Sequence, residues 1–309
     1  GKPFNHNLYG WDNEYGTHDA VIDDFKASKY LCSNGEFFEF IQSGGYDDAQ
    51  NWTEEGWRWK IFDGKGHPRF WCKTDSGWKL RLVFNEIEMP WNWPVEVNYL
   101  EAKAFCNWKA AQTGKTIRLP MEEEWQLLYN HSNVPDQPYW ELAPGNINME
   151  HFQSPAPVDL FAFGAFFDVI GNVWQWTETP INGFKNFKIH PYYDDFSTPT
   201  FDLQHNLIKG GSWISTGNEA TAHARYAFRR HFYQHAGFRY IESSQPVIVN
   251  ADVYETDPEV TRNCEAHYGR PLFSTANYNE QLARFCIELF DNKPARRALD
   301  LGCQVGRTT

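Results

Sequence analysis

A chain of 309 residues, 41% of them hydrophobic and 17% aromatic, has enough apolar material to bury one large core. Its formal net charge of -12 argues against a protein that follows a nucleic-acid backbone with a basic face. No window approaches the roughly 18–20 consecutive apolar residues that a membrane helix needs, and no signal peptide opens the chain. The six cysteines form no CxxC pair and no dense framework, which favours reduced thiols in a cytoplasmic protein.

The first part of the chain is predicted to alternate loops with short helices. Residues 1–20 are polar and rich in asparagine, glycine and aromatic side chains, which is typical of a loop. A helix is predicted from Asn34, whose side chain can cap the first turn, to Ile41, and Gly44 can end it in a left-handed conformation. The tryptophan-rich run 51–59 predicts a second, short helix.

The clearest helical pattern covers Tyr99–Gln112, where apolar side chains recur at i, i+3 and i+4 and Gly114 follows. Residues 81–84 are strand-like. The early carboxylates of 118–125 favour the start of another helix, because they lie near the positive end of the helix dipole. Residues 136–170, with several prolines, are predicted to be mostly loop.

The character of the sequence changes after Arg239. Residues 242–246 are typical of a linker, and a helix is predicted to end near Phe290. Residues 297–306 then have the pattern of a buried strand running into a glycine turn, close to the end of the chain. Since a strand with no following helix cannot bury both faces, we expect this to be the first piece of a larger domain.

The chain is organised around residues 171–239, where glycines, tryptophans and arginines alternate with few clean strand or helix periods. Glycine permits tight loops, and buried indole rings supply apolar area with a polar handle. Five blocks, in the right order, resemble the formylglycine-generating-enzyme-like superfamily: Ala104–Trp108, Arg118–Trp125, Gly171–Trp176, Gly210–Trp213 and Gly237–Arg239. The resemblance implies an α+β, C-type-lectin-like fold with little regular secondary structure.

Within that superfamily, the segments Phe4–Glu14 and Tyr192–Tyr240 are similar to ovothiol synthase, the 5-histidylcysteine sulfoxide synthase family. Its members join an N-terminal four-helix domain, the lectin-like domain and a C-terminal methyltransferase. The resemblance implies four parts: a connecting segment over 1–20, a formylglycine-generating-enzyme-like (sulfatase-modifying-factor) domain over 21–241, a linker over 242–270 and the truncated start of an α/β methyltransferase over 271–309.

The tail of the chain carries the candidate cofactor contacts. Asp300, Gly302 and Gly306 resemble the glycine loop that cradles S-adenosylmethionine (SAM), in which an acidic residue and glycines follow a strand. Their position downstream of a lectin-like core supports this interpretation. They would contact the cofactor in the intact methyltransferase, and we expect them to bind nothing in the truncated one.

The resemblance also implies an O2-dependent reaction, in which a mononuclear Fe(II) site joins the sulfur of cysteine to the imidazole of histidine and leaves a sulfoxide. The family's iron motif, His-x-x-x-His-x-Glu plus a further histidine, lies mainly in the N-terminal domain. The chain begins at Gly1 without methionine, so we expect that domain to precede it. The chain alone should then hold no metal tightly and be inactive. His231 and His235 mimic the spacing, but glycine stands at the third ligand position, so we interpret both as packing or supporting residues.

Arginines of the closing block are candidates for binding the substrate, because an amino acid brings a carboxylate that arginine holds with a bidentate fork. Arg229 and Arg230 are the first candidates and Arg225 is a further one. The alternative is that they pair with carboxylates of the protein itself. Arg239 belongs to the Gly-Phe-Arg block of the whole superfamily, so we expect it to be structural.

A tyrosine is the candidate catalytic residue. The sulfoxide synthases use one near the iron to steer proton and electron transfer, and the resemblance points to residues 192–197. Tyr193 is the first choice and Tyr192 the second. The hydroxyl can donate a proton only within hydrogen-bond reach of the reacting group. The alternative is that Tyr193 packs on the tryptophan-rich core.

Two other functions stay open. A formylglycine-generating oxidase would bind copper with a cysteine pair near the C-terminal end of the lectin-like core, yet no cysteine lies between Cys106 and Cys264. A non-catalytic lectin-like module would only bind ligands, and would have no need of a methyltransferase. We therefore expect the substrate-binding part of a cytoplasmic sulfoxide synthase acting on cysteine, histidine and O2, with no nucleic-acid or membrane partner.

Overall fold

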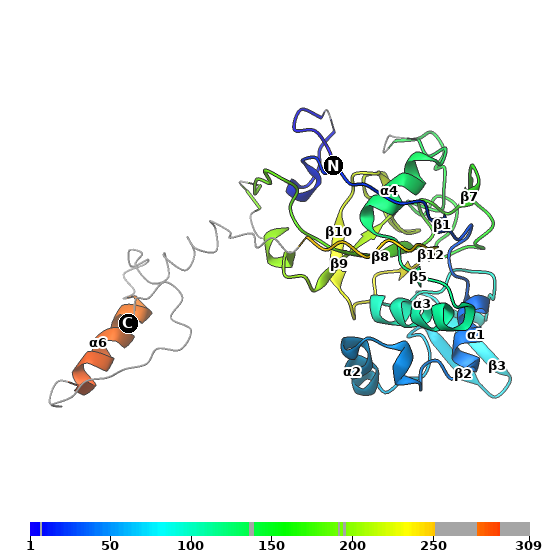
Figure 1. Ribbon diagram of the computed structural model, residues 1–309, viewed down its shortest axis with the longest axis horizontal. Helices are drawn as coiled ribbons and strands as arrows, with labels where there is room; N and C mark the ends of the chain where they lie inside the picture. Colours follow the sequence, from blue (N-terminus) through cyan, green and yellow to red (C-terminus); the bar gives the residue numbers. More distant parts are fainter. Residues whose placement is uncertain (7, 136–138, 191, 194–195, 251–276, 291–309) are drawn as a thin grey trace. The chain divides into compact units, whose positions relative to one another are not determined.

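The computed structural model describes residues 1–6, 8–135, 139–190, 192–193, 196–250 and 277–290. The chain divides into two compact units, residues 1–252 and 253–309. In the second unit the structure describes one helix, α6 (Tyr278–Phe290), which ends where the sequence predicts (Figure 1). The predicted SAM-binding residues Asp300, Gly302 and Gly306 lie outside the described residues.

The helices of the first unit form close to their predicted positions. They are α1 (Asn34–Gln42), α2 (Glu54–Asp63), α3 (Tyr99–Thr113) and α4 (Glu122–Asn130), with short 3-10 turns at Asp12–Glu14, Ala49–Asn51, Thr198–Thr200 and Gly217–Ala220. Ser33, rather than Asn34, caps α1, because its hydroxyl accepts the backbone N–H of Glu36. Gly114 ends α3 with a left-handed φ of 68°, as predicted.

The strands form small sheets around a central one. The central sheet has the order β10 (Tyr226–Arg229), β9 (His205–Lys209), β8 (Trp174–Pro180) and β11 (Ala236–Gly237), and β11 runs parallel to β8. The other sheets are β1 (Lys26–Ala27), β12 (Ile241–Glu242) and β5 (Ile117–Arg118); β2 (Trp71–Thr74), β3 (Gly77–Arg81) and β4 (Glu86–Glu88); and β6 (Ala162–Phe163) with β7 (Phe166–Phe167).

Two predicted boundaries are wrong for local reasons. Residues 82–84 are not part of a strand, because β3 ends at Arg81 and the N–H of Leu82 bonds to the carbonyl of Asn85 in a tight turn. The helix predicted over 118–125 begins only at Glu122, since Arg118 is still paired in β5.

The core is built from the aromatic residues that the composition supplies. α3 and α4 lie on opposite sides of the central sheet (Figure 1). On the α3 side, Phe105 and Cys106 are fully buried in one cluster with Trp176 and Phe238. On the α4 side, Trp125 is fully buried in a second cluster. The helical spacing of apolar residues in α3 thus predicted its buried face correctly.

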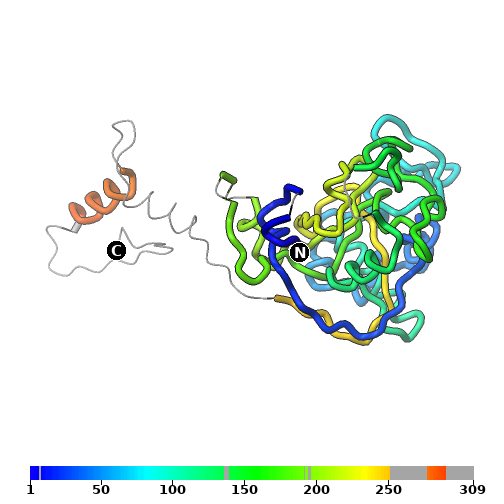
Figure 2. Tube along the Cα trace, turned by 90° about the horizontal axis from the view of Figure 1, so that it is seen from above, coloured from blue at the N-terminus to red at the C-terminus, as the bar shows by residue number. Residues whose placement is uncertain are grey.

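The two ends of the first unit run side by side. Figure 2 shows the blue segment near residue 20 following the yellow segment that leaves β12. Gln245 fixes this arrangement, because its side chain accepts the N–H of Asp23 at 2.9 Å and donates to the carbonyl of Val21 at 3.0 Å. Residues 1–20 are mostly irregular, as predicted, apart from the turn at Asp12–Glu14.

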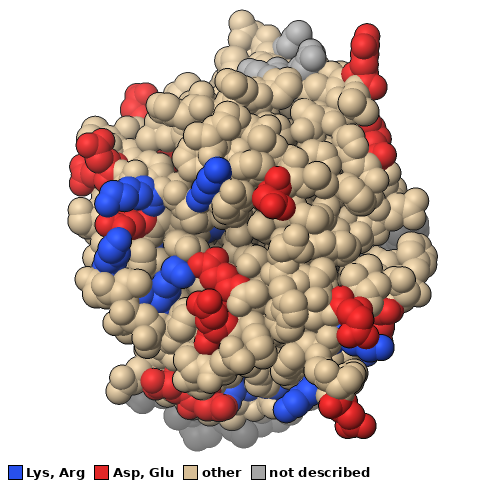
Figure 3. Space-filling model, turned by 90° about the vertical axis from the view of Figure 1, so that its right-hand side faces the viewer, with Lys and Arg blue, Asp and Glu red and all other residues tan. Residues whose placement is uncertain are grey.

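The surface mixes charges of both signs. On the face shown in Figure 3, basic side chains lie beside acidic ones rather than in a patch of their own. Within the described ranges, no helix is both long enough and apolar enough to span a bilayer.

Glu101, in the first turn of α3, has a buried carboxyl group whose pKa lies above its ordinary value. Its buried carboxylate accepts the Tyr46 hydroxyl at 2.7 Å and the backbone N–H of Asn98 at 3.0 Å. Burial raises the pKa of Glu101 to about 7, although both hydrogen bonds oppose the change. The folded protein therefore binds a proton here that the unfolded chain releases at lower pH.

We predict that the Glu101→Gln variant is more stable than the wild type at pH 8 and about equally stable at pH 4. An unfolded glutamate ionises near pH 4.3, so the stability contributed by neutral Glu101 is lost as the pH rises from about 4 to about 7, and the loss is about 2–4 kcal/mol at pH 8. Urea unfolding at the two pH values measures the difference, with the exposed Glu54→Gln as control. An equal difference at both pH values would contradict this assignment.

Candidate active site

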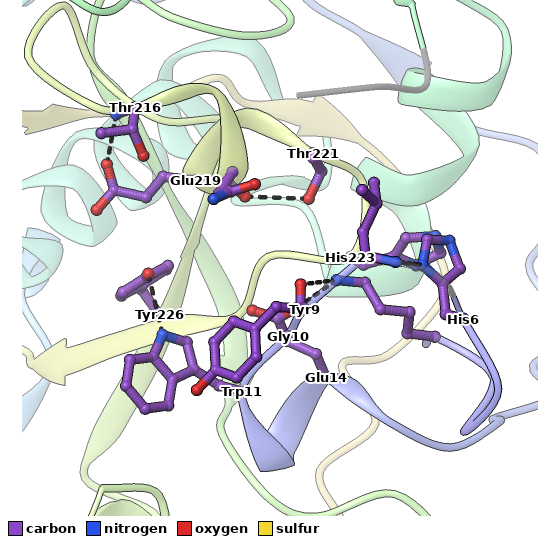
Figure 4. A pocket seen from close by; sticks show the side chains of 13 residues that line it. His6, Tyr9, Gly10, Trp11, Glu14, Thr216, Glu219, Thr221, His223 and Tyr226 are labelled. Atoms are coloured by element: carbon purple, nitrogen blue, oxygen red, sulfur yellow. Dashed lines mark hydrogen bonds and ion pairs between the residues drawn. The ribbon is translucent and has the colours of Figure 1, made fainter. Parts of the chain in front are cut away.

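A cavity of about 230 Å³ lies between the N-terminal segment and the residues that lead into β10. Figure 4 shows its two walls: His6, Tyr9, Trp11 and Glu14 on one side and Thr216, Glu219, His223 and Tyr226 on the other. These walls come from the two segments, 4–14 and 192–240, that carry the finer sequence resemblance. Residues more than 200 positions apart therefore form one concave surface.

The walls of the cavity carry groups that can hold or exchange protons. The Trp11 indole N–H donates to the Tyr226 hydroxyl at 3.3 Å, and burial raises the pKa of Tyr226 to about 12. Burial also raises the pKa of Glu14, against the opposing effect of Lys2, whose ammonium lies 3.1 Å from the carboxylate. The rings of His6 and His223 meet edge to face, with centroids 5.8 Å apart.

Arg225 holds the N-terminal segment against the core. Its side chain is buried, and each of its nitrogens donates to the protein: Nε and Nη2 to the Glu122 carboxylate, and Nη1 to the carbonyls of Asn13 and Asn182 at 2.6 and 3.0 Å. The guanidinium also lies 4.0 Å from the centre of the Phe184 ring. Burial alone would raise the pKa of Glu122, but Arg225 and its neighbour Lys209 outweigh it and lower this pKa to about 2.

Asp12 ties the N-terminal segment to the loop that carries the predicted tyrosine. Its carboxylate accepts the backbone N–H of His190 at 3.1 Å and the hydroxyl of Ser197. Asn13 adds a hydrogen bond of 2.8 Å from its amide to the same Ser197 hydroxyl oxygen. The loop is thus fixed at both of its ends, on either side of Tyr193.

Tyr193 packs beside the cavity in an aromatic cluster. Its ring centroid is 5.7 Å from that of Trp11, and Phe196 stacks on Trp11 at 4.0 Å. Tyr193 is 47% exposed, whereas Tyr192 is 93% exposed and points to solvent. The position of Tyr193 is compatible with both alternatives from the sequence, since the ring packs on a residue that lines the cavity.

The structure does not bring the predicted carboxylate-binding arginines to this cavity. Arg229 ends β10, three residues beyond Tyr226, and its nearest acidic partner is Asp202 at 4.0 Å. Arg230 donates to Glu55 at 2.7 Å, and also to the Asn206 side chain and the Leu203 carbonyl. Arg225 lies next to Tyr226 but is fully engaged as described above. Arg239 is buried and its guanidinium bonds to backbone carbonyls, including that of Ser28 at 2.6 Å, which is the structural arrangement expected for it.

The two histidines that mimic an iron motif have different surroundings. His231 is exposed and packs edge-on against Phe232, whereas Nδ1 of His235 lies 2.8 Å from a carboxylate oxygen of Glu96. In the part of the chain that the structure describes, no three His, Cys, Asp or Glu side chains converge on one point. These residues alone therefore do not fit a three-ligand Fe(II) site.

Sequence reasoning missed most residues of the cavity wall. His6, Glu14 and His223 follow no helical or strand period and belong to no motif with a known spacing, whereas Glu219 belongs to a Thr-x-x-Glu capping box with Thr216. The indication in the sequence was the family resemblance of residues 4–14. That resemblance pointed to a functional role for the segment, but it did not show which other segment lies opposite it.

Comparison with known proteins agrees with the observed fold. Residues 3–244 match the model of the Sulfatase-modifying factor enzyme 1-like domain. The chain is 31% identical to hercynine oxygenase of Mycobacterium tuberculosis over 216 residues, which cover 65% of this chain and 48% of that protein. It is 24% identical to Ergothioneine biosynthesis protein 1 of Schizosaccharomyces pombe, over 75% of this chain and 26% of that protein. The chain thus spans about half the length, or less, of these relatives.

A solved structure is similar in fold. Treponema denticola variable protein 1 superposes with a TM-score of 0.50 at 15% sequence identity, covering 77% of this chain and 90% of that one. At that identity the similarity shows the fold alone. The mixed fold with few helices and small sheets, inferred from the sequence blocks, is thereby confirmed for the first unit.

We predict that Asp12→Ala releases the loop carrying Tyr193. The substitution leaves the N–H of His190 and the Ser197 hydroxyl without their acceptor, which should lower the free energy of unfolding by about 1–3 kcal/mol. Hydrogen exchange of the His190 amide should accelerate, while Asp19→Ala, an exposed aspartate of the same segment, should change neither quantity. Unchanged exchange at His190 in Asp12→Ala would show that the loop is held by other contacts.

Proposed function

The chain belongs to the family of Sulfatase-modifying factor enzyme 1-like domains, and on that premise we propose that it is the substrate-binding part of a sulfoxide synthase. The observation that carries the proposal is the cavity, because the two segments that resemble ovothiol synthase face each other across it. The similarity to hercynine oxygenase and to an ergothioneine biosynthesis protein supports the same class of oxidoreductase.

A more specific version of this proposal includes the substrates and the domain organisation. Cysteine would supply the sulfur and histidine the imidazole, as in ovothiol formation, and the protein would act in the cytoplasm. Residues 1–20 would connect an iron-binding domain to the formylglycine-generating-enzyme-like domain over 21–241. Residues 242–270 would link it to a SAM-dependent methyltransferase starting at 271. The support for this organisation is the sequence resemblance of the segments 4–14, 192–240 and 300–306.

Fe(II), when bound, would supply the activation of O2. The described residues lack a three-ligand set, so the proposal assigns the ligands to the preceding domain and gives this chain other tasks. Those tasks are to enclose the substrates, to exclude water with the Trp11 and Phe196 rings, and to hold protons. Tyr226 keeps its proton at Oη over the neutral range because burial raises its pKa to about 12.

Tyr193 is the proposed proton donor. Its ring packs on Trp11, and Asp12 holds His190 and Ser197 on either side of it, which supports a defined position next to the cavity. It is also half-exposed, which leaves it accessible to a substrate in the neighbouring cavity. A donor must lie within hydrogen-bond reach of the group it protonates, so a fixed loop favours this role over a freely moving one.

We predict that Tyr193→Phe in the full-length protein changes the ratio of coupled sulfoxide to oxidised cysteine. The substitution keeps the ring that packs on Trp11 and removes only the hydroxyl. Mass spectrometry of products formed from cysteine, histidine, Fe(II) and O2 measures the ratio. Tyr192→Phe is the control, because that ring is 93% exposed. An unchanged ratio would remove Tyr193 from the catalytic residues, and a full-length protein without any oxidation product would favour a non-catalytic binding module.

Arg229 does not line the cavity, so its proposed role as partner of a substrate carboxylate requires a substrate that extends beyond the cavity to the end of β10. Its side chain is half-exposed and its ion pair with Asp202 is long, at 4.0 Å, which leaves it available for that role. We predict that Arg229→Ala raises KM for cysteine or histidine by about tenfold or more with a smaller change in kcat, because a charge-assisted hydrogen bond is lost. Arg58→Ala, on the exposed face of α2, is the control. An unchanged KM for both substrates would exclude Arg229 from their binding.

A further inference from the structure

A second cavity, of about 120 Å³, lies away from the candidate active site and shares none of its lining residues. One wall comes from the hairpin around β3, and the other from the loop 153–155 and the residues that flank β11. Its apolar lining consists of Phe70, Leu82, Val83, Pro155 and Trp213, and its polar lining of Arg81, Glu96, Gln153, Ser154 and His235.

A partly exposed ion pair forms the polar end of this cavity. Nδ1 of His235 lies 2.8 Å from Oε1 of Glu96, a residue that is only 6% exposed. The His235 backbone has a left-handed φ of 48°, which is uncommon for a residue other than glycine. Its carbonyl accepts the N–H of Trp174 at 3.0 Å, which fixes this conformation against β8. The fold therefore holds the imidazole in one place and one orientation.

One hydrogen-bond donor on this wall has no acceptor among the described residues. The second ring nitrogen of His235, Nε2, makes no hydrogen bond there, and the side chain is 35% exposed, so this nitrogen is accessible. The Trp213 ring packs edge to face against the imidazole, with centroids 5.1 Å apart, while its own indole Nε1 is buried and inaccessible. An accessible donor beside apolar walls is suited to a ligand that accepts a hydrogen bond and also brings apolar surface.

The charges around the cavity favour an anionic acceptor. The hydrogen bond to Glu96 raises the pKa of His235 despite partial burial, so the imidazolium is favoured and Nε2 carries a proton. Glu96 balances that charge from the other side of the ring. The remaining charged group of the lining is Arg81 at the rim, whose Nε and Nη2 are 3.2 Å from the Glu86 carboxylate. A single negative charge can therefore be accommodated at Nε2, while the apolar walls disfavour a dianion.

We propose that this cavity binds a small monocarboxylate, whose carboxylate accepts the Nε2–H of His235 and whose short branched aliphatic body packs against Leu82 and Val83. The volume is about that of four water molecules, which restricts the ligand to a short chain. The site is independent of the proposed sulfoxide chemistry, because it shares no residue with the first cavity.

The test uses isobutyrate as the probe and isobutyramide as its neutral isostere. Binding is followed by the ring nitrogen signals of His235 in histidine-labelled protein. Isobutyrate should bind with a Kd on the order of millimolar, as expected for so few atoms, and isobutyramide at least tenfold more weakly. Affinity for isobutyrate should fall as the pH rises through the raised pKa of His235, since the imidazolium loses its Nε2 proton.

Two variants separate the site from a non-specific effect. His235→Asn removes the imidazole and keeps a residue that tolerates the left-handed backbone, so it should weaken isobutyrate binding at least tenfold. His231→Asn, an exposed histidine of the same segment, should leave it unchanged. Equal binding of the acid and the amide, or unchanged affinity in His235→Asn, would overturn the proposal.

A third variant covers the case in which His235→Asn does not fold. Val83 is 58% exposed, so Val83→Phe can be accommodated and should fill the apolar part of the cavity. It should abolish isobutyrate binding while His235 still titrates as in the wild type. Retained binding in Val83→Phe would show that the acid binds elsewhere, and the proposal would again be wrong.

Discussion

The arrangement of this protein depends on the buried guanidinium of Arg225. It joins α4 through Glu122, the N-terminal segment through the carbonyl of Asn13, and the chain after β8 through the carbonyl of Asn182. Removing one partner of a buried ion pair leaves an uncompensated charge and is destabilising by about 3–5 kcal/mol. The N-terminal segment is therefore part of the folded core in an energetic sense, although it contains almost no regular structure.

Lys209 extends the same cluster to the opposite wall of the cavity. Its ammonium is buried and donates to the carbonyls of Ala222 and Ala224, at 3.1 and 2.7 Å, and to Glu122 at 3.4 Å. These two carbonyls bracket His223, whose ring meets that of His6. Both walls of the first cavity are thus linked to the single carboxylate of Glu122, one through Arg225 and the other through Lys209. A cavity whose walls share one buried anchor keeps its dimensions, which is a requirement for holding two substrates in a reactive geometry.

The sequence predicts the parts of this fold that depend on neighbouring residues and misses those that depend on distant ones. The period of apolar residues in α3 and the glycine after it are local, and both were predicted correctly. The cap of α1 was misplaced by one residue because serine and asparagine cap helices about equally well. Arg225 shows the limit: its partner Asn13 is 212 positions away. No local pattern distinguishes an arginine with internal acceptors from one that is free for a substrate, so the sequence could name candidate arginines without showing which of them have partners inside the protein.

The surroundings of His235 and the side chains that line the first cavity together indicate which chemical steps this part of the chain can perform. His235 has the i, i+4 spacing from His231 that a helical metal motif would show, but the segment between them is not helical, and Glu96 already occupies its Nδ1. The first cavity is lined by two imidazoles, two carboxylates and two phenols, yet within the described ranges they do not converge as a metal-ligand set. A surface with fixed proton donors and aromatic walls can bind, orient and protonate substrates, whereas activation of O2 needs an open metal centre. This division of tasks is what would be expected of a scaffold that supplies one wall of an active site and meets the metal from another part of the same protein.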